Sequence, residues 1–163
     1  MLVHGDTFAL LSELAIAVAG FAGVAVALGG RARTFGPFEL LRLNALFQYS
    51  ALILGGCFGL FVLNAAGLGS ADAIRLVSIA GAFGYGAIGI RTVPRAFRLL
   101  AASDGSASSP ARVYLVAGTY LVFIALFLVN GLVLADEWPL LIVFSSSLLM
   151  ALWIFHGLLT LRG

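Results

Sequence analysis

Five long, uninterrupted apolar runs constrain what this chain can fold into. They cover about residues 7–29, 37–65, 72–93, 110–134 and 138–161. A helix rises about 1.5 Å per residue and the hydrocarbon core of a bilayer is about 30 Å thick, so roughly 20 apolar residues are enough to cross it. The runs are too continuous for membrane β-strands, which alternate over about ten residues. The sequence therefore predicts an all-α fold, a polytopic bundle of five transmembrane helices in a single domain.

The balance of charged and apolar residues points to lipid as the solvent. Of the 163 residues, 62% are hydrophobic and only 10% are charged, whereas a soluble domain has roughly 25% charged residues. A chain of this composition lacks the polar side chains to coat a water-soluble globule. We expect a multi-pass protein of the plasma membrane, of the bacterial inner-membrane type, with membrane lipids as partners and no nucleic-acid partner.

Prolines and a polar linker place the ends of these helices. Pro37 and Pro110 stand where a first helical turn tolerates proline best, whereas Pro94 is expected to stop the third helix. Residues 94–109, which include the run SDGSASS, are predicted to form a flexible cytoplasmic loop. Within this loop, residues 94–102 also suit a short interfacial helix that turns its arginines to water.

The first run has a competing interpretation as a signal peptide, because residues 25–27 (AVA) resemble a small-residue cleavage site. A signal peptide begins with positive charge. This run instead carries Asp6 and Glu13, and the chain reaches its first arginine only at Arg31. We therefore expect a helix that is retained in the mature protein.

Arginine accounts for all nine basic residues, and its distribution predicts the orientation of the chain. Short cytoplasmic loops of membrane proteins are enriched in basic residues. The two connections that follow the first and third runs carry most of them: Arg31, Arg33, Arg91, Arg95, Arg98 and Arg112. We expect the N-terminus outside and the C-terminus in the cytoplasm. The arginines would then form a cytoplasmic face that contacts anionic lipid or a partner protein.

Polar side chains at membrane depth are the candidate functional residues, because each is costly in lipid and usually faces protein. At about 1.5 Å per residue, Glu13 lies roughly 9 Å below the outer surface. Side chains from three other helices fall near this level. The predicted polar intramembrane layer comprises Glu13, Gln48, Ser50, Arg75, Ser78, Ser145, Ser146 and Ser147.

Two interpretations of this layer remain open. In the structural one, Glu13 and Arg75 form an ion pair and the serines and amides make hydrogen bonds between helices. In the functional one, Glu13 is a proton or cation site and the serines line a polar path. The small-residue face that Glu13 shares predicts that Glu13 faces the interior of the bundle.

Small residues at helical spacing predict which helices approach closely. Glu13, Ala17 and Gly20 share one face of the first helix, and similar faces occur on the second and third. The predicted packing seam comprises Gly20, Asn44, Gly55, Gly59, Ala82 and Gly86. We therefore expect the first three helices to form the centre of the bundle, and the bulky fourth helix to be the most exposed to lipid.

Signatures of catalysis and of metal binding are missing from the sequence. It contains no GxSxG, HExxH or P-loop motif. Cys57 is the single cysteine, so no redox pair forms within the chain. His4 and His156 fall on opposite sides of the predicted membrane and cannot ligate one metal in one chain. We expect no catalytic residue, no metal and no cofactor, and an enzyme or redox anchor is only a third possibility.

Two functions fit these features. The first is a homo-oligomeric channel or transport-type protein, in which a pore forms between subunits near Glu13. The alternative is a non-catalytic structural or lipid-binding subunit of a larger membrane complex, with the arginine-rich face as its docking surface.

Overall fold

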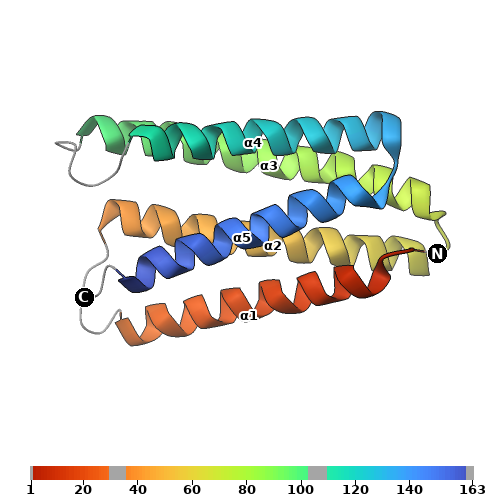
Figure 1. Cartoon of the computed structure of the whole chain (residues 1–163), viewed down its shortest axis with the longest axis horizontal. Coiled ribbons are helices and arrows are strands. Elements are labelled where there is room, and N and C mark those ends of the chain that lie inside the picture. Colours follow the sequence, from red (N-terminus) through yellow and green to blue (C-terminus); the bar gives the residue numbers. More distant parts are fainter. Residues whose placement is uncertain (1, 30–35, 103–109, 161–163) are drawn as a thin grey trace.

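The computed structural model describes residues 2–29, 36–102 and 110–160, except for the side chains of residues 25, 26, 28, 29, 112 and 158–160. The helices are α1 (Gly5–Gly29), α2 (Pro37–Ala65), α3 (Ser70–Ala102), α4 (Pro110–Val129) and α5 (Glu137–Thr160). No strand occurs in the described ranges. The chain is thus all-helical (Figure 1), and each of the five helices contains a segment long and apolar enough to cross a membrane.

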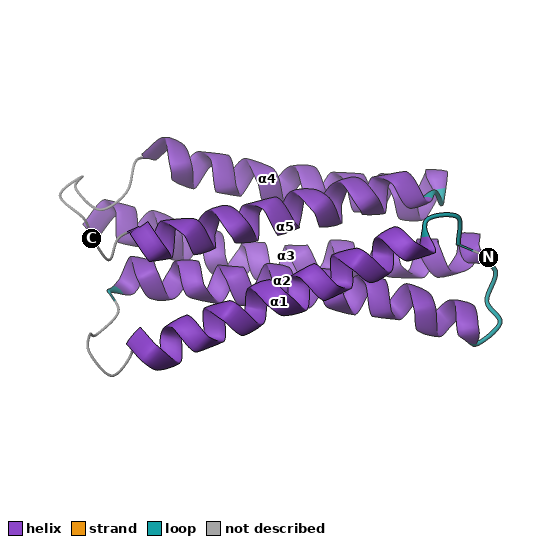
Figure 2. Ribbon diagram, turned by 60° about the horizontal axis from the view of Figure 1, so that its bottom comes forward, coloured by secondary structure: helices purple, strands orange, loops and turns teal. Residues whose placement is uncertain are grey.

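The helix α2 lies at the centre of the bundle. It packs against α1, α3 and α5, while α3 also pairs with α4 along its length. The N-terminus and the α2–α3 and α4–α5 connections lie at one end, as Figure 2 shows. The opposite end, which we call the arginine-rich end, carries Arg42, Arg91, Arg95 and Arg98. The prediction that the first three helices form the centre is wrong, because α1 packs against α2 and α5 rather than against α3.

The third helix does not stop at Pro94. It continues as an α-helix to Ala102, so the predicted end at residue 93 is wrong and residues 94–102 are not a loop. A proline within a helix removes one hydrogen bond and crowds one carbonyl, and the rest of the helix tolerates this where neighbouring groups compensate. The continuation places Arg95 and Arg98 on a rigid helix beside the start of α2.

Glycines let bulky side chains rest directly on neighbouring helix backbones. A methyl group built on Gly56 of α2 would lie 2.3 Å from Cζ of Phe144 on α5, and one on Gly81 would lie 2.8 Å from the ring of Phe127. Gly84 meets Leu52 in the same way, at 2.8 Å. These contacts, rather than the predicted seam, set how closely α2, α3, α4 and α5 approach.

The predicted packing seam is largely misplaced. Gly20, Asn44 and Gly55 are exposed, and nothing lies within 4 Å of a methyl group built on Gly86. Two members do lie at helix contacts. Gly59 faces Val77 at 3.4 Å, and Ala82 is buried. The contact face of α2 is turned by one residue from the prediction, toward Gly56.

A π-helical turn, η1 (Asn130–Leu134), ends the fourth helix before the chain reverses into α5. Asn130 is fully buried and holds the reversal together. Its amide group donates to Ser78 Oγ and to the Asp136 carbonyl, both at 2.9 Å, and its Oδ1 accepts the Asp136 N–H at 3.0 Å. Ala135 takes the left-handed conformation (φ 54°) that completes the turn. The continuous helix predicted over 110–134 is therefore interrupted at its last five residues.

Glu137 fastens the N-terminus to the start of α5. Its carboxylate is only 6% exposed and accepts the backbone N–H groups of Val3 and His4, each at 2.7 Å. The His4 and Trp138 rings lie beside this pair, with centroids 4.8 Å apart. Glu137 stands in the first turn of α5, where the helix dipole favours a negative charge. Of the two adjacent acidic residues, Asp136 is exposed, whereas Glu137 is buried and holds the N-terminus against α5.

Candidate functional site

A cavity of about 330 Å³ opens between α2, α3, α4 and α5 in the arginine-rich half of the bundle. One stripe of α2 forms its wall, with residues at helical spacing: Phe38, Leu41, Arg42, Ala45 and Tyr49. The volume is within the range of small-molecule sites, about 300–1,000 Å³. We call this space the tyrosine cavity, after the residue at its inner end.

Three tyrosines from three helices meet at the inner end of the cavity. The rings of Tyr49 and Tyr120 stack with centroids 5.9 Å apart, and Tyr85 lies 6.3 Å from each of them. All three are nearly fully buried. Phe123 and Phe127 close the cluster on the α4 side. Aromatic pairs at these distances are mutually stabilising and make a rigid floor.

The hydroxyls of Tyr49 and Tyr85 differ in their hydrogen bonding. Tyr85 bonds to Ser147 Oγ, and because Ser147 itself donates to the Val143 carbonyl at 2.7 Å, the Tyr85 hydroxyl is the donor. The Tyr49 hydroxyl is buried and makes no hydrogen bond of normal geometry in the described part of the chain, although the Tyr120 side chain is its polar neighbour. A buried hydroxyl without a well-formed hydrogen bond costs roughly 1–3 kcal/mol, so the Tyr49 hydroxyl calls for an explanation.

The other walls of the cavity are mostly apolar. Val113 and Val116 come from α4, and Met150 and Ile154 come from α5. Figure 1 shows α5 beginning beside the end of α4 and then running away from it toward α1. Side chains of both helices line the cavity.

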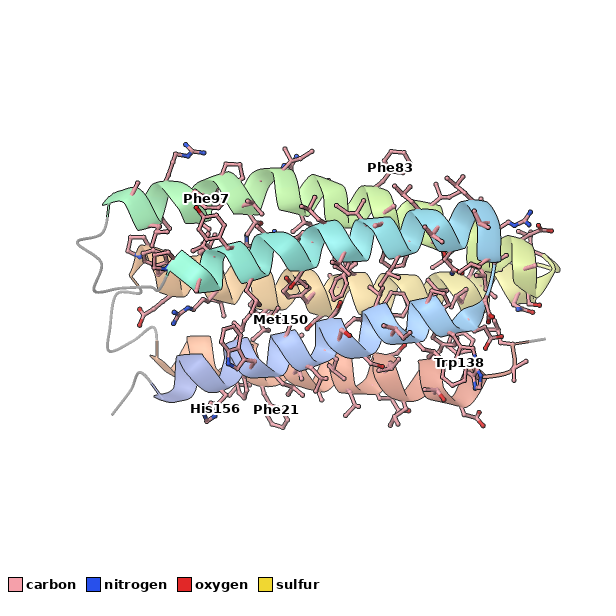
Figure 3. All side chains as sticks on the ribbon, turned by 45° about the horizontal axis from the view of Figure 1, so that its top comes forward. Phe21, Phe83, Phe97, Trp138, Met150 and His156 are labelled. Atoms are coloured by element: carbon pink, nitrogen blue, oxygen red, sulfur yellow. The ribbon has the colours of Figure 1, made fainter. Side chains whose placement is uncertain are left out.

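Polar and aromatic groups surround the mouth of the cavity. Arg42 is half-buried, seven residues and about 10 Å along α2 from Tyr49. Trp153 is 50% exposed, and His156 lies one turn further along α5. Figure 3 shows His156 and Met150 far from Trp138, which marks the other end of α5. A molecule in the cavity would thus meet apolar walls, Tyr49 at its inner end and a cation near the mouth.

The predicted polar layer is not brought together. Glu13 is exposed on the outer face of α1, together with Ala17 and Gly20, so the inward Glu13 of the prediction is wrong for the single chain. Arg75 is exposed on α3, a helix that α1 does not pack against, so the structure does not pair it with Glu13. The helix α1 has apolar residues all round, and its small-residue face is exposed in the single chain instead of packed against another helix.

The remaining members of the layer fall into separate local environments. Ser78 bonds to Asn130, and Ser147 bonds to Tyr85. Ser50 Oγ and Gln48 Oε1 are buried without a hydrogen-bond partner in the described residues, like the adjacent Tyr49 hydroxyl. Ser145 and Ser146 are half-buried on α5. In the described residues, the buried polar atoms without a hydrogen bond are therefore those of residues 48–50 and Asn64 Nδ2 at the other end of α2.

The predicted arginine face is described in part. The side chains of Arg31, Arg33 and Arg112 lie outside the described residues. Arg91, Arg95 and Arg98 are all exposed on the last turns of α3. Arg95 and Arg98 line a second space, a groove beside the start of α2.

Sequence reasoning missed the tyrosine cluster, Asn130 and Glu137. The three tyrosines belong to separate helices and share no motif, so only the three-dimensional packing brings them together. A signal for Asn130 was present, because a lone amide at the end of an apolar run and six residues before an acidic turn suits a reversal.

No set of three His, Cys, Asp or Glu side chains that could hold a metal ion occurs in residues 2–29, 36–102 and 110–160 as described. Comparison of the chain with protein-family models, with curated proteins and with solved structures found no match.

Proposed function

We propose that this multi-pass membrane protein binds an amphiphilic membrane molecule in the tyrosine cavity. The observation that carries the proposal is the Tyr49 hydroxyl, which is buried at the inner end of the cavity without a well-formed hydrogen bond. A ligand with a hydrogen-bonding group at Tyr49 and an apolar portion along α4 and α5 would satisfy it. This is the lipid-binding version of the two functions expected from the sequence.

The arrangement of the cavity supports a ligand that arrives from the bilayer. Its apolar walls, which include Val113 and Val116 of α4 and Met150 and Ile154 of α5, match an acyl or isoprenoid chain. Arg42 near the mouth suits an acidic or polar group at the membrane surface. Recovering the hydrogen bond to Tyr49 inside a low-dielectric interior would contribute more than the same bond in water.

The proposal predicts that gently extracted protein retains one small amphiphile per chain, and that Tyr49→Phe loses it. We expect about a tenfold weaker affinity in this variant, because one buried hydrogen bond to the ligand is removed. Native mass spectrometry of the detergent-solubilised protein measures the retained mass directly. Tyr85→Phe is the matched control, since it removes a hydroxyl from the same cluster that is already bonded within the protein. Retention that is equal in both variants, or absent from the parent protein, would contradict the proposal.

We further propose the orientation that the arginines predict, with the N-terminus outside and the arginine-rich end in the cytoplasm of a bacterial-type cell. Cys57 is fully buried, so cysteines introduced elsewhere report on their own positions. We expect Gly69→Cys to react with a membrane-impermeant maleimide in intact cells. Ala101→Cys should react only after the membrane is opened. The reverse pattern of labelling would refute the orientation.

A second candidate, the oligomeric channel or transport-type protein, is favoured by the position of Glu13. Its side chain is exposed within an apolar span that covers Gly5–Val24. A charged group in lipid costs roughly 2.5–3.5 kcal/mol at the middle of a helix. A second copy packed on Ala17 and Gly20 would remove Glu13 from lipid and place it at the interface between subunits.

This second candidate predicts that the purified protein is a defined oligomer and that Ala17→Leu dissociates it. Glu13→Gln should change the ion flux through protein reconstituted in liposomes. Ala19→Leu, on a neighbouring and less exposed face of α1, serves as the control for added bulk. A monomeric native mass, or an ion flux that Glu13→Gln leaves unchanged, would remove the support for a pore at this residue. Membership of a larger complex stays a prediction, which recovery of a partner under gentle extraction would test.

A further inference from the structure

A groove of about 460 Å³ lies between the first turns of α2 and the last turns of α3, at the arginine-rich end. Pro37, Leu40 and Asn44 line it from α2, and Arg95, Arg98 and Leu99 line it from α3. It shares only Leu41 with the tyrosine cavity. We propose that this groove binds the phosphate headgroup of an anionic phospholipid of the surrounding membrane.

The two arginines give the groove a strong positive charge. Both are exposed, and no acidic side chain lines the groove in the described part of the chain. Glu39 is the acidic residue next to the groove residue Leu40 in the sequence. Its carboxylate accepts the backbone N–H of Gly36 at 2.8 Å. Arg98 Nε donates to the Pro94 carbonyl at 3.4 Å, which leaves its two Nη groups for an anion. Guanidinium groups bind phosphate through paired hydrogen bonds, so two of them on one helix face form a phosphate site.

The level of the groove in the membrane identifies the source of the phosphate. Counted from Ser70, Arg91 lies 21 residues along α3, which is about 32 Å at the standard rise and close to the thickness of the hydrocarbon core. Arg95 and Arg98 then lie roughly 6 to 10 Å further out, in the layer of the lipid headgroups. Because α3 continues through Pro94 as a helix, these arginines are held at that level rather than on a loop.

The remaining lining fits the rest of a phospholipid. Leu40 and Leu99 offer an apolar surface to the beginning of an acyl chain, and the exposed amide of Asn44 can donate to an ester carbonyl one level deeper. A free phosphate ion would use only the arginines. A soluble protein partner would not reach Asn44, which lies seven residues, or about 10 Å, inside α2.

Titration of the solubilised full-length protein with short-chain lipids tests this assignment. Dioctanoyl phosphatidylglycerol is the probe, dioctanoyl phosphatidylcholine is the zwitterionic control, and native mass spectrometry counts the lipids bound. We expect the Arg95→Gln/Arg98→Gln variant to bind dioctanoyl phosphatidylglycerol about 30-fold more weakly. Each arginine near an anionic headgroup contributes roughly a fivefold gain in affinity. Arg91→Gln removes an exposed arginine one turn earlier on the same helix, outside the groove, and should change the affinity by less than about twofold at physiological salt.

Three results would overturn the proposal. Equal losses in the Arg91 variant and the double variant would show a diffuse electrostatic attraction without a site. Equal binding of both lipids to the parent protein would show that the arginines do not select an anionic headgroup. Unchanged lipid binding in the double variant, together with loss of a co-purified protein, would assign the groove to a protein partner. Because the Tyr49→Phe variant leaves this groove intact, its failure to lose a ligand would not affect the titration.

Discussion

Replacing Gly56 with alanine is expected to destabilise the protein by about 3 kcal/mol, at the upper end of the range for overpacking in a core. The added methyl group would stand 2.3 Å from Cζ of Phe144 and about 3 Å from both neighbouring ring carbons. The ring cannot move aside easily, because Phe144 is 1% exposed and is held between Phe8 and Phe127. The helices α2 and α5 must therefore separate, or the ring must leave its site. Chemical or thermal unfolding of the protein in detergent, followed by circular dichroism, measures the effect.

The adjacent glycine provides a matched control. A methyl group on Gly55 meets nothing within 4 Å, and this residue is exposed. Gly55→Ala should therefore stabilise the protein by about 0.5–1 kcal/mol, because alanine loses less backbone entropy than glycine in a helix. Two variants of identical chemistry, one residue apart, should thus shift the free energy of unfolding in opposite directions. Equal effects would mean that Phe144 does not pack on α2 as described.

Replacing Asn130 with alanine is expected to cost about 3–4 kcal/mol. The substitution removes three hydrogen bonds at once and leaves the Asp136 backbone N–H and carbonyl without their partner. It also frees Ser78 Oγ inside the bundle, where no water replaces the lost bond. The reversal between η1 and α5 would then open, and with it the contact between the N-terminus and Glu137.

Two further variants separate this polar role from simple loss of side-chain volume. Asn130→Asp keeps an acceptor for the Asp136 N–H but loses both amide donors, so its free energy of unfolding should lie between those of the parent and the alanine variant. Asn44→Ala, at an exposed position of α2, should change stability by no more than about 0.5 kcal/mol. An Asn130→Ala protein as stable as the Asn44→Ala protein would contradict the role of Asn130 in the reversal between η1 and α5. Urea unfolding at constant detergent concentration distinguishes these cases.

The sequence was sufficient for the class of fold, and the reason is physical. Spanning a bilayer requires about 20 apolar residues in one run. Such runs can be recognised in the sequence without knowing which helices are in contact. The starts of α2 and α4 at proline follow equally local rules. Pro94 misled because proline removes one hydrogen bond and crowds one carbonyl without always ending a helix, and α3 continues past it to Ala102.

The direction in which each helix faces was harder to predict, because lipid and protein interior are both apolar. In water, the buried face of a helix differs from the exposed face in polarity, and the pattern can be read directly. On α1, the buried face contains Leu11, Ala15 and Val18, while the exposed face contains Ala17 and Gly20. Nothing in polarity separates these two faces. Glu13, the one charged residue of α1 beyond its first turn, was placed inside because charged groups in membrane helices usually face protein, and the structure places it outside.

The candidate site was beyond prediction for a related reason. The Tyr49, Tyr85 and Tyr120 side chains meet only because α2, α3 and α4 pack in one particular register. Which hydroxyl is satisfied depends on Ser147 of a fourth helix. No spacing in the sequence records that the Tyr49 hydroxyl lacks a well-formed hydrogen bond. The level of a polar residue can be counted along a helix, but its neighbours across the bundle cannot.

The unfolding midpoints of Tyr49→Phe and Tyr85→Phe, measured on protein as gently extracted and again after exhaustive washing with detergent, test the central claim most directly. In the washed, ligand-free state, Tyr49→Phe should be more stable than the parent by about 1 kcal/mol, because it removes a buried hydroxyl without a well-formed hydrogen bond, and Tyr85→Phe should be less stable by a similar amount. The parent and Tyr85→Phe should lose stability on washing, since a bound molecule stabilises the folded state by mass action, while Tyr49→Phe should lose little. If Tyr49→Phe is instead destabilised when washed, and washing lowers all three midpoints equally, the tyrosine cavity holds no ligand at Tyr49.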